Sequence, residues 1–131
     1  MRLLLDTHIA LWSVAKSSRL PEKARRLIAD EEHQVAVSVV SVWEIAVKHA
    51  KTADRPDGMA VSGARALDAF ERAGFEILPI TAAHAAALDG LPPVHQDPFD
   101  RMIVTQALTT PLHLVTADKV LGRYSETVIL V

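Results

Sequence analysis

Short apolar runs alternate along the chain with longer segments of helical periodicity. Five runs have the length and composition of buried strands, and they lie at residues 2 to 5, 35 to 38, 75 to 80, 113 to 116 and 127 to 130. Helical patterns lie between them, at about residues 7 to 14, 22 to 30, 39 to 51, 63 to 73, 81 to 88 and 98 to 108. This alternation predicts an α/β fold in which helices flank a central, mostly parallel sheet of about five strands.

The length and composition indicate one domain spanning residues 1 to 131. No apolar run approaches the roughly 18 residues that favour a membrane span, and the N-terminal run ends at Asp6 after three leucines, too early for a signal peptide. The absence of cysteine excludes disulfides and thiolate metal sites. We therefore expect a soluble, cytoplasmic protein without membrane association.

The net charge of −2 lacks the overall basic excess of many nucleic-acid binders. Basic residues nevertheless gather at positions 16 to 26 and 48 to 55. A solvated helix face is the simpler interpretation of both clusters. If the protein binds a polyanion, the candidate contacts are Lys16, Arg19, Lys48 and Arg101.

Acidic residues follow the predicted strands at the edge where open α/β sheets bind ligands. Asp6 directly follows the first strand, Asp118 follows the fourth, and Glu44 lies in the helix after the second. Helix capping is the alternative role for each of them. Asp6 is placed to cap the helix at 7 to 14, Asp118 the turn at 119 to 122, and Ser41 with Glu44 has the spacing of a capping box.

Two aspartates open the helix at 98 to 108. Asp97 precedes Pro98 and stands where an N-cap belongs, so its loss should cost about 1 kcal/mol of stability. On a helical projection Asp100 falls inside an apolar arc, whereas Arg101 and Thr105 take the polar side. The arc consists of Phe99, Met102, Ile103, Val104, Ala107 and Leu108. A carboxylate in such a stripe must be paired, protonated or bound to a cation.

The same projection is less decisive for the helix at 39 to 51. It places Glu44 toward Ser41 and Lys48, at the border of the polar side. The apolar face consists of Val42, Trp43, Ala46, Val47 and Ala50. Periodicity alone does not distinguish a ligand from a surface glutamate here.

If these acids converge, their repulsion would raise their pKa values unless cations neutralise them. Carboxylates without cysteine suit Mg²⁺, with Mn²⁺ as the alternative. No histidine has a zinc-type spacing, so we interpret each as structural or exposed. His95, beside the acidic stretch, is the histidine of most interest. A magnesium site of this kind suits hydrolysis at phosphorus.

Four segments, in order, resemble the motifs of PIN-domain proteins, and specifically of VapC-type ribonuclease toxins. They are LLLDTH, SVVSVWEIAVK, LPPVHQDPFDRMIVTQAL and HLVTADKVL. The resemblance implies a Mg²⁺-dependent endoribonuclease that forms a homodimer and is neutralised by a VapB-type antitoxin. The implied catalytic residues are Asp6, Glu44, Asp100 and Asp118.

Within that set we expect Asp6, Asp100 and Asp118 to bind the metal and Glu44 to ligate or orient the attacking water. The resemblance also implies supporting roles for Thr7 and Thr116, and Asp97 is a further candidate through a bridging water. Residues 52 to 63 match no motif, so they leave the choice of RNA open. Within them, residues 52 to 58 are typical of turns and of a mobile loop.

Other functions remain as alternatives. A PIN nuclease of RNA processing without an antitoxin has the same motifs, and a non-catalytic PIN-like interaction module would not need all four acids. A phosphotransfer or phosphohydrolase domain is disfavoured, because Asp6 is single and position 8 is His.

Overall fold

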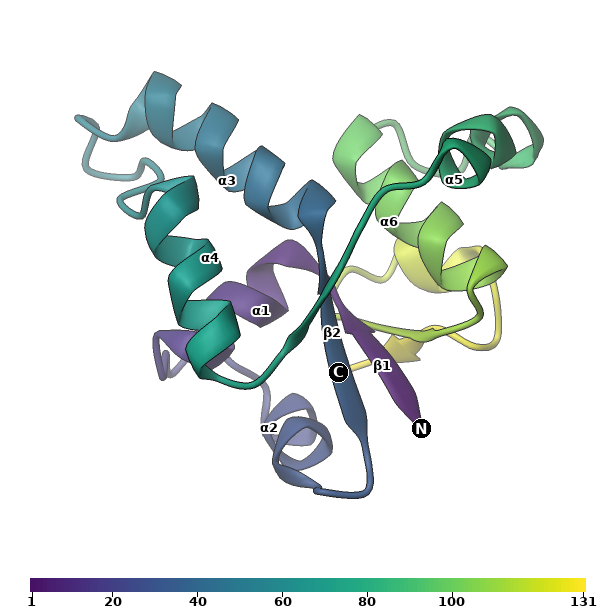
Figure 1. The fold of residues 1–131 in the computed structure, drawn as a ribbon, viewed down its shortest axis with the longest axis horizontal. Helices are drawn as coiled ribbons and strands as arrows, with labels where there is room; N and C mark the ends of the chain where they lie inside the picture. The colour runs from purple at the N-terminus through teal and green to yellow at the C-terminus, as the bar shows by residue number, and fades with distance from the viewer.

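Five parallel strands form one sheet in the computed structural model, which describes residues 1–131 (Figure 1). The order across the sheet is β3-β2-β1-β4-β5. Every neighbouring pair is parallel. The strands are β1 (Arg2–Leu5), β2 (Gln34–Ser38), β3 (Glu76–Leu78), β4 (His113–Thr116) and β5 (Ile129–Leu130). Because the chain turns back between β3 and β4, the topological switch point lies between β1 and β4, where such sheets bind ligands.

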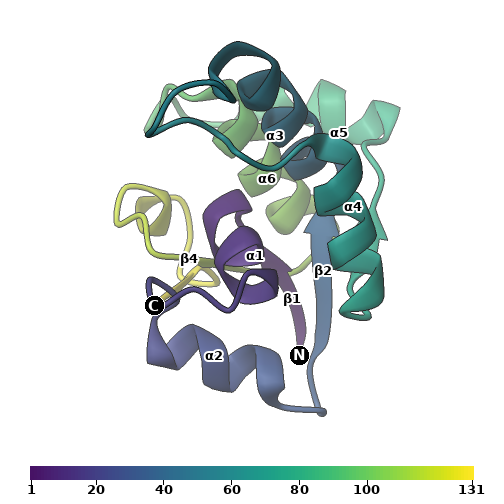
Figure 2. The same ribbon diagram turned by 90° about the vertical axis from the view of Figure 1, so that its left-hand side faces the viewer.

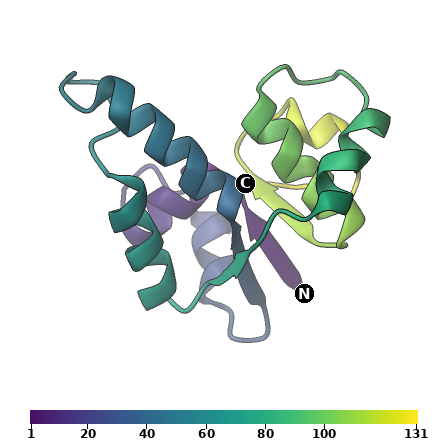
Figure 3. The same ribbon diagram turned by 45° about the horizontal axis from the view of Figure 1, so that its top comes forward.

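Six α-helices connect and cover the strands. They are α1 (Thr7–Val14), α2 (Glu22–Ala29), α3 (Val39–Thr52), α4 (Gly63–Arg72), α5 (Ala82–Ala87) and α6 (Pro98–Thr109). Single 3₁₀ turns follow at Leu88–Gly90 and Leu121–Arg123. Figure 2 shows α1, α2 and α4 in front of the strands, and Figure 3 shows α5 and α6 on the other side. No helix is long and apolar enough to cross a bilayer.

The side chains of β1 divide between two hydrophobic cores, one on each face of the sheet. Leu3 and Leu5 pack with residues of α1, α2, α3 and α4, including Phe70. Leu4 packs on the other face with α6, including Ile103. Successive side chains of a strand point to opposite faces, so burial on both faces explains why these strands are continuous apolar runs. The predicted fold class is confirmed.

The outer strands are shorter than the sequence predicts. The run at 75 to 80 forms a strand only over Glu76–Leu78, because Pro79 has no N–H to continue the ladder. The last strand is limited to Ile129–Leu130, and Val128 instead donates its N–H to Ser125 in a turn. Both are edge strands, which pair on one side only.

The projection of α3 predicted the wrong face. Trp43 is 55% exposed, whereas Glu44 is 4% exposed and Ser41 is fully buried. The helix packs against α1 and α4 on one side and α6 on another, and these neighbours select its buried stripe. The capping box of Ser41 and Glu44 is also wrong, because Ser38 is the N-cap and accepts the Val40 N–H at 2.9 Å.

The projection of α6 is correct for Ile103, Val104 and Ala107, which are buried. It is wrong for Leu108, which is 39% exposed, and for Thr105, which is buried. Thr105 tolerates burial because its hydroxyl donates to the carbonyl of Arg101, one turn earlier, at 2.8 Å. The next residue, Gln106, is buried as well, with its amide bonded to Ser38 and to the carbonyl of Pro79.

Candidate active site

Asp6 lies at the carboxyl end of β1 and is 7% exposed. It is the N-cap of α1, and its Oδ1 accepts the Ile9 N–H at 2.9 Å. Its Oδ2 accepts a hydrogen bond from the Thr116 hydroxyl. Burial raises the pKa of Asp6 and outweighs the hydrogen bonds, which act to lower it. The alternative role predicted for Asp6, capping of the helix at its start, is thus confirmed, and the cap uses Oδ1 and leaves Oδ2 to bond Thr116.

Thr116 joins the acids of two adjacent strands. It ends β4, is fully buried, and donates its hydroxyl to Asp6 while accepting the Asp118 N–H at 3.0 Å. Asp118 in turn accepts the Val120 N–H through Oδ1 at 2.9 Å, which leaves Oδ2 free of the turn. One hydroxyl therefore fixes the spacing of Asp6 and Asp118 at the switch point between β1 and β4.

Glu44 approaches the same edge from α3, with both oxygens bonded. The Thr7 hydroxyl donates to Oε1 at 2.7 Å, and the Lys48 ammonium group, one turn along, donates to Oε2. The Ser41 hydroxyl oxygen lies 2.9 Å from that of Thr7, so the two hydroxyls are hydrogen-bonded. Burial alone would lower the pKa of Lys48, but the hydrogen bond to Glu44 and the charges of nearby acids raise it. Thr7 and Lys48 thus bond both carboxyl oxygens of a buried glutamate.

Asp97 and Asp100 enter the site from the first turn of α6. Asp97 is the N-cap, as predicted, and its Oδ1 accepts the N–H groups of Phe99 at 2.8 Å and Asp100 at 3.1 Å. The Asp100 side chain is 24% exposed. Burial, with smaller contributions from Asp97, Glu44 and Asp6, raises the pKa of Asp100 to about 7, against the opposing effect of His95. Asp100 therefore lies in a field of negative charge.

His95 lies between Asp100 and Asp118. Its Nδ1 accepts the Asp97 N–H at 3.0 Å, so Nε2 carries the hydrogen. Nε2 lies 3.1 Å from Asp118 Oδ2 and 3.6 Å from Asp100 Oδ2. A ring held this way donates from Nε2 and has no lone pair there for a metal. His95 is therefore an orienting donor to the two carboxylates.

The acids form two overlapping groups. A ring nitrogen of His95 and one carboxylate oxygen each of Asp100 and Asp118 lie within 4.8 Å of one another. Asp6 and Glu44 stand outside that tight group, although both raise the pKa of Asp100. Asp6 is joined to Asp118 through Thr116. The structure thus gathers the four acids expected from the sequence at one edge of the sheet and adds a histidine to them.

The segment that carries His95 is clamped from α6 and from the C-terminal region. The Tyr124 hydroxyl accepts the His95 N–H at 2.8 Å. The Arg101 guanidinium donates to the carbonyls of Pro92 at 3.0 Å, Leu91 at 3.3 Å and His95 at 3.3 Å. The sequence predicted Arg101 as a polyanion contact, but in the structure its guanidinium donates to carbonyls of this segment. No local pattern indicates Tyr124, because it lies 29 residues from His95.

Of the remaining predicted RNA contacts, Lys16 and Arg19 lie beyond the end of α1, and Lys48 lies in α3. Lys16 is exposed and adopts a positive φ of 51° in the turn that follows α1. Arg19 is exposed as well, and together with Lys48 it lines a pocket beside the acids. Neither Lys16 nor Arg19 has an ion pair with an acid of the site.

Fold and site together define a parallel α/β domain with clustered carboxylates at its switch point. The family model of the PIN domain matches residues 3–126, so the chain belongs to the PIN domain family. No curated protein matches the chain.

Three solved structures with low sequence identity share the fold. VapBC2 from Rickettsia felis, bound to a DNA fragment from its promoter, matches with a TM-score of 0.69 and 18% identity over 100% of this chain and 98% of that chain. A toxin-antitoxin complex from Klebsiella pneumoniae matches with a TM-score of 0.64 and 19% identity, covering 97% and 95%. FitAcB from Neisseria gonorrhoeae matches with a TM-score of 0.63 and 18% identity, covering 98% and 96%.

Proposed function

We propose that this protein is a Mg²⁺-dependent endoribonuclease that acts as the toxin of a toxin–antitoxin pair. The observation that carries the proposal is the convergence of Asp6, Glu44, Asp100 and Asp118 at the carboxyl edge of a PIN-domain sheet. Clustered carboxylates at a switch point suit phosphodiester hydrolysis better than a purely structural role, because their mutual repulsion costs stability.

The donors of the site fit a hard divalent cation. Asp6, Asp100 and Asp118 would hold Mg²⁺, or Mn²⁺ as the alternative, through carboxylate oxygens. The pKa of Asp100, raised to about 7, supports this assignment, because the side chains alone do not compensate its charge. When bound, the ion would lower the pKa of a water molecule and neutralise charge that develops on the phosphodiester.

The surrounding side chains position these groups. The Thr116 hydroxyl donates to the Asp6 carboxylate and accepts the Asp118 N–H, so it connects these two residues. The Thr7 hydroxyl donates to one carboxyl oxygen of Glu44 and fixes its position. We assign to Glu44 the orientation of the attacking water. Asp97 uses only Oδ1 in its cap, which leaves Oδ2 for a water-mediated contact with the site.

The proposed partners are supported by the fold relatives, one of which is a toxin–antitoxin complex from Klebsiella pneumoniae. We propose a cytoplasmic protein with an RNA substrate, a VapB-type antitoxin and a homodimeric state. Trp43 is 55% exposed and packs edge-to-face against Phe99 at 4.9 Å between ring centroids. This aromatic pair joins α3 to α6 and is our candidate surface for the dimer.

The test incubates the purified protein with a panel of structured RNAs, with Mg²⁺ and with a chelator. We expect the wild type to cleave only with Mg²⁺, Asp100→Asn to be inactive, and Asp89→Asn, an exposed acid outside the site, to cleave normally. Expression of the protein alone should arrest growth, and the antitoxin should restore it. RNA cleavage without growth arrest would favour an RNA-processing nuclease. Absence of RNA cleavage both with Mg²⁺ and with chelator would favour a non-catalytic interaction module.

A further inference from the structure

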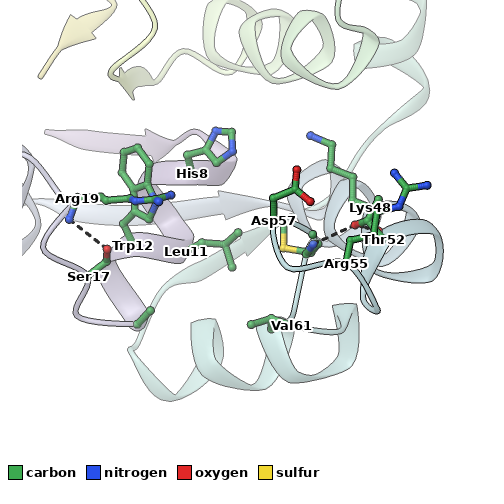
Figure 4. Close-up of a pocket in the computed structure, with 13 residues that line it drawn as sticks. His8, Leu11, Trp12, Ser17, Arg19, Lys48, Thr52, Arg55, Asp57 and Val61 are labelled. Atoms are coloured by element: carbon green, nitrogen blue, oxygen red, sulfur yellow. Dashed lines mark hydrogen bonds between the residues drawn. The ribbon is translucent and has the colours of Figure 1, made fainter.

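A pocket of about 620 Å³ opens beside the acidic site, between α1 and the segment that follows α3 (Figure 4). Its volume is within the range of small-molecule sites, about 300 to 1,000 Å³. His8, Trp12 and Arg19 line one side, and Lys48, Arg55 and Met59 line the other. The pocket is therefore large enough to accept a planar group with its substituents.

The far wall of the pocket is formed by residues 52 to 63, and it is anchored to α3. The Thr52 hydroxyl accepts the Met59 N–H at 3.0 Å and donates to the carbonyl of Lys48 at 2.7 Å. His49 Nδ1 donates to the carbonyl of Met59 at 2.9 Å. A Cβ at Gly58 would stand 1.7 Å from the carbonyl oxygen of Thr52, so the close approach requires glycine. The sequence indicated a mobile loop, but these bonds tie it to the helix.

The lining combines aromatic and cationic groups. The His8 and Trp12 rings are stacked, with centroids 5.6 Å apart and planes at 27°. Arg19, Lys48 and Arg55 supply positive charge around the pocket, against Asp57 as the acid in the lining. Aromatic faces among basic side chains are the combination that binds the bases and phosphates of single-stranded nucleic acid. An apolar peptide segment would not need the cations.

Two residues that line the pocket, His8 and Lys48, are neighbours of residues in the acidic site. His8 lies two positions after Asp6, in the first turn of α1. Lys48 lines the pocket and pairs with Glu44. Figure 4 shows the His8 and Lys48 side chains extending to the same side of the pocket. An RNA strand whose phosphodiester lies at the acids would therefore pass the mouth of the pocket.

We propose that this pocket binds a nucleobase of the RNA strand next to the scissile phosphodiester. The base stacks on the aromatic pair of His8 and Trp12, and Arg19 and Arg55 contact neighbouring phosphates. The inference rests on the proposed nuclease function and adds a subsite to it. It also gives residues 52 to 63, which lie outside the four motif segments, a role in selecting the cleavage position.

The experiment measures binding of a short single-stranded RNA to the Asp100→Asn protein in chelator, so that cleavage does not interfere. Trp12→Leu should weaken binding on the order of tenfold to a hundredfold, because base stacking is lost, and Trp12→Phe should retain most of the affinity. Arg55→Ala should reduce the slope of log affinity against log salt by about 0.7. Arg72→Ala, an exposed arginine of α4 that pairs with Asp68, is the matched control and should bind normally.

A second arm replaces one nucleotide at a time with an abasic residue. We expect a single position to weaken binding to the protein with Trp12, and that dependence to disappear in Trp12→Leu. Unchanged RNA affinity in both Trp12→Leu and Arg55→Ala overturns the inference, as does a loss of antitoxin binding alone in these variants. Metal-dependent cleavage by the wild type, measured separately, shows whether the nuclease proposal stands or fails independently of the pocket.

Discussion

Replacing Asp100 with Asn removes the carboxylate whose pKa is raised to about 7 by burial and by neighbouring acids. The folded protein keeps this proton up to about pH 7, whereas the unfolded chain loses it near the ordinary value of 3.8. The stability that protonated Asp100 contributes is therefore complete below about pH 4 and is lost as the pH rises through about 7. Asn does not titrate, so the variant escapes this loss.

The size of the effect follows from the pKa. A rise from 3.8 to about 7 corresponds to about 4 kcal/mol at full strength. The Asp100 side chain is 24% exposed, so solvent screens part of the repulsion. In chelator, we expect Asp100→Asn to exceed the wild type in stability by about 1–3 kcal/mol at pH 8, with a gap that narrows toward pH 4.

Urea unfolding, followed by tryptophan fluorescence between pH 4 and pH 8, measures this difference. Asp89→Asn, an exposed acid on the turn after α5, is the control and should follow the wild type throughout. Added Mg²⁺ should stabilise the wild type at pH 8 and leave Asp100→Asn unchanged, because a ligand stabilises only the state that binds it. A stability difference that does not vary with pH, or an Asp100→Asn variant less stable than the wild type at pH 8, would refute the claim that ionised Asp100 destabilises the protein.

Three further substitutions test the structure around the site. Gly58→Ala should destabilise the protein by about 1–3 kcal/mol in urea unfolding, because its Cβ would meet the carbonyl oxygen of Thr52. Gly90→Ala is the control, because its Cβ would meet nothing within 4 Å, and equal effects of the two substitutions would contradict the close approach at Gly58. Thr116→Val should raise the Mg²⁺ concentration for half-maximal cleavage about 10- to 100-fold, because Asp6 loses its orienting hydroxyl, and an unchanged Mg²⁺ dependence would exclude that role. Asp97→Ala should cost about 1 kcal/mol in thermal unfolding and Asp97→Asn much less, because Asn retains an N-cap acceptor; an equal loss in both variants would argue against capping.

The features that sequence predicted well depend on local physics. Strands buried on both faces give continuous apolar runs, so the sequence alone predicts the parallel α/β fold class. Asp97 was recognised as an N-cap because Pro98 fixes the helix start. Asp100 was singled out because a charge stood in an apolar arc, and the structure gives it a raised pKa.

The features that sequence missed depend on which elements meet. The buried face of α3 is set by α1, α4 and α6. Trp43 is therefore exposed against the helical projection, and Glu44, which periodicity left undecided, is buried. The clamp on His95 uses Arg101 from α6 and Tyr124 from beyond β4. Such contacts join residues far apart in sequence, and no spacing rule indicates them.

The pocket was missed for a similar reason. Its two walls come from α1 and from residues 52 to 63, which become neighbours only when α1 and α4 pack on the same face. The basic residues of both walls form separate clusters in the sequence. Their common location beside Trp12 follows from the fold.

The central claim is that carboxylates at the switch point cleave RNA with a divalent cation. The most direct measurement is the rate of cleavage of one RNA as a function of Mg²⁺ concentration, for the wild type, Asp6→Asn and Asp89→Asn. We expect saturable Mg²⁺ dependence in the wild type and Asp89→Asn, and no product from Asp6→Asn although it remains folded. Product formed in chelator, or wild-type rates in Asp6→Asn, would contradict the claim.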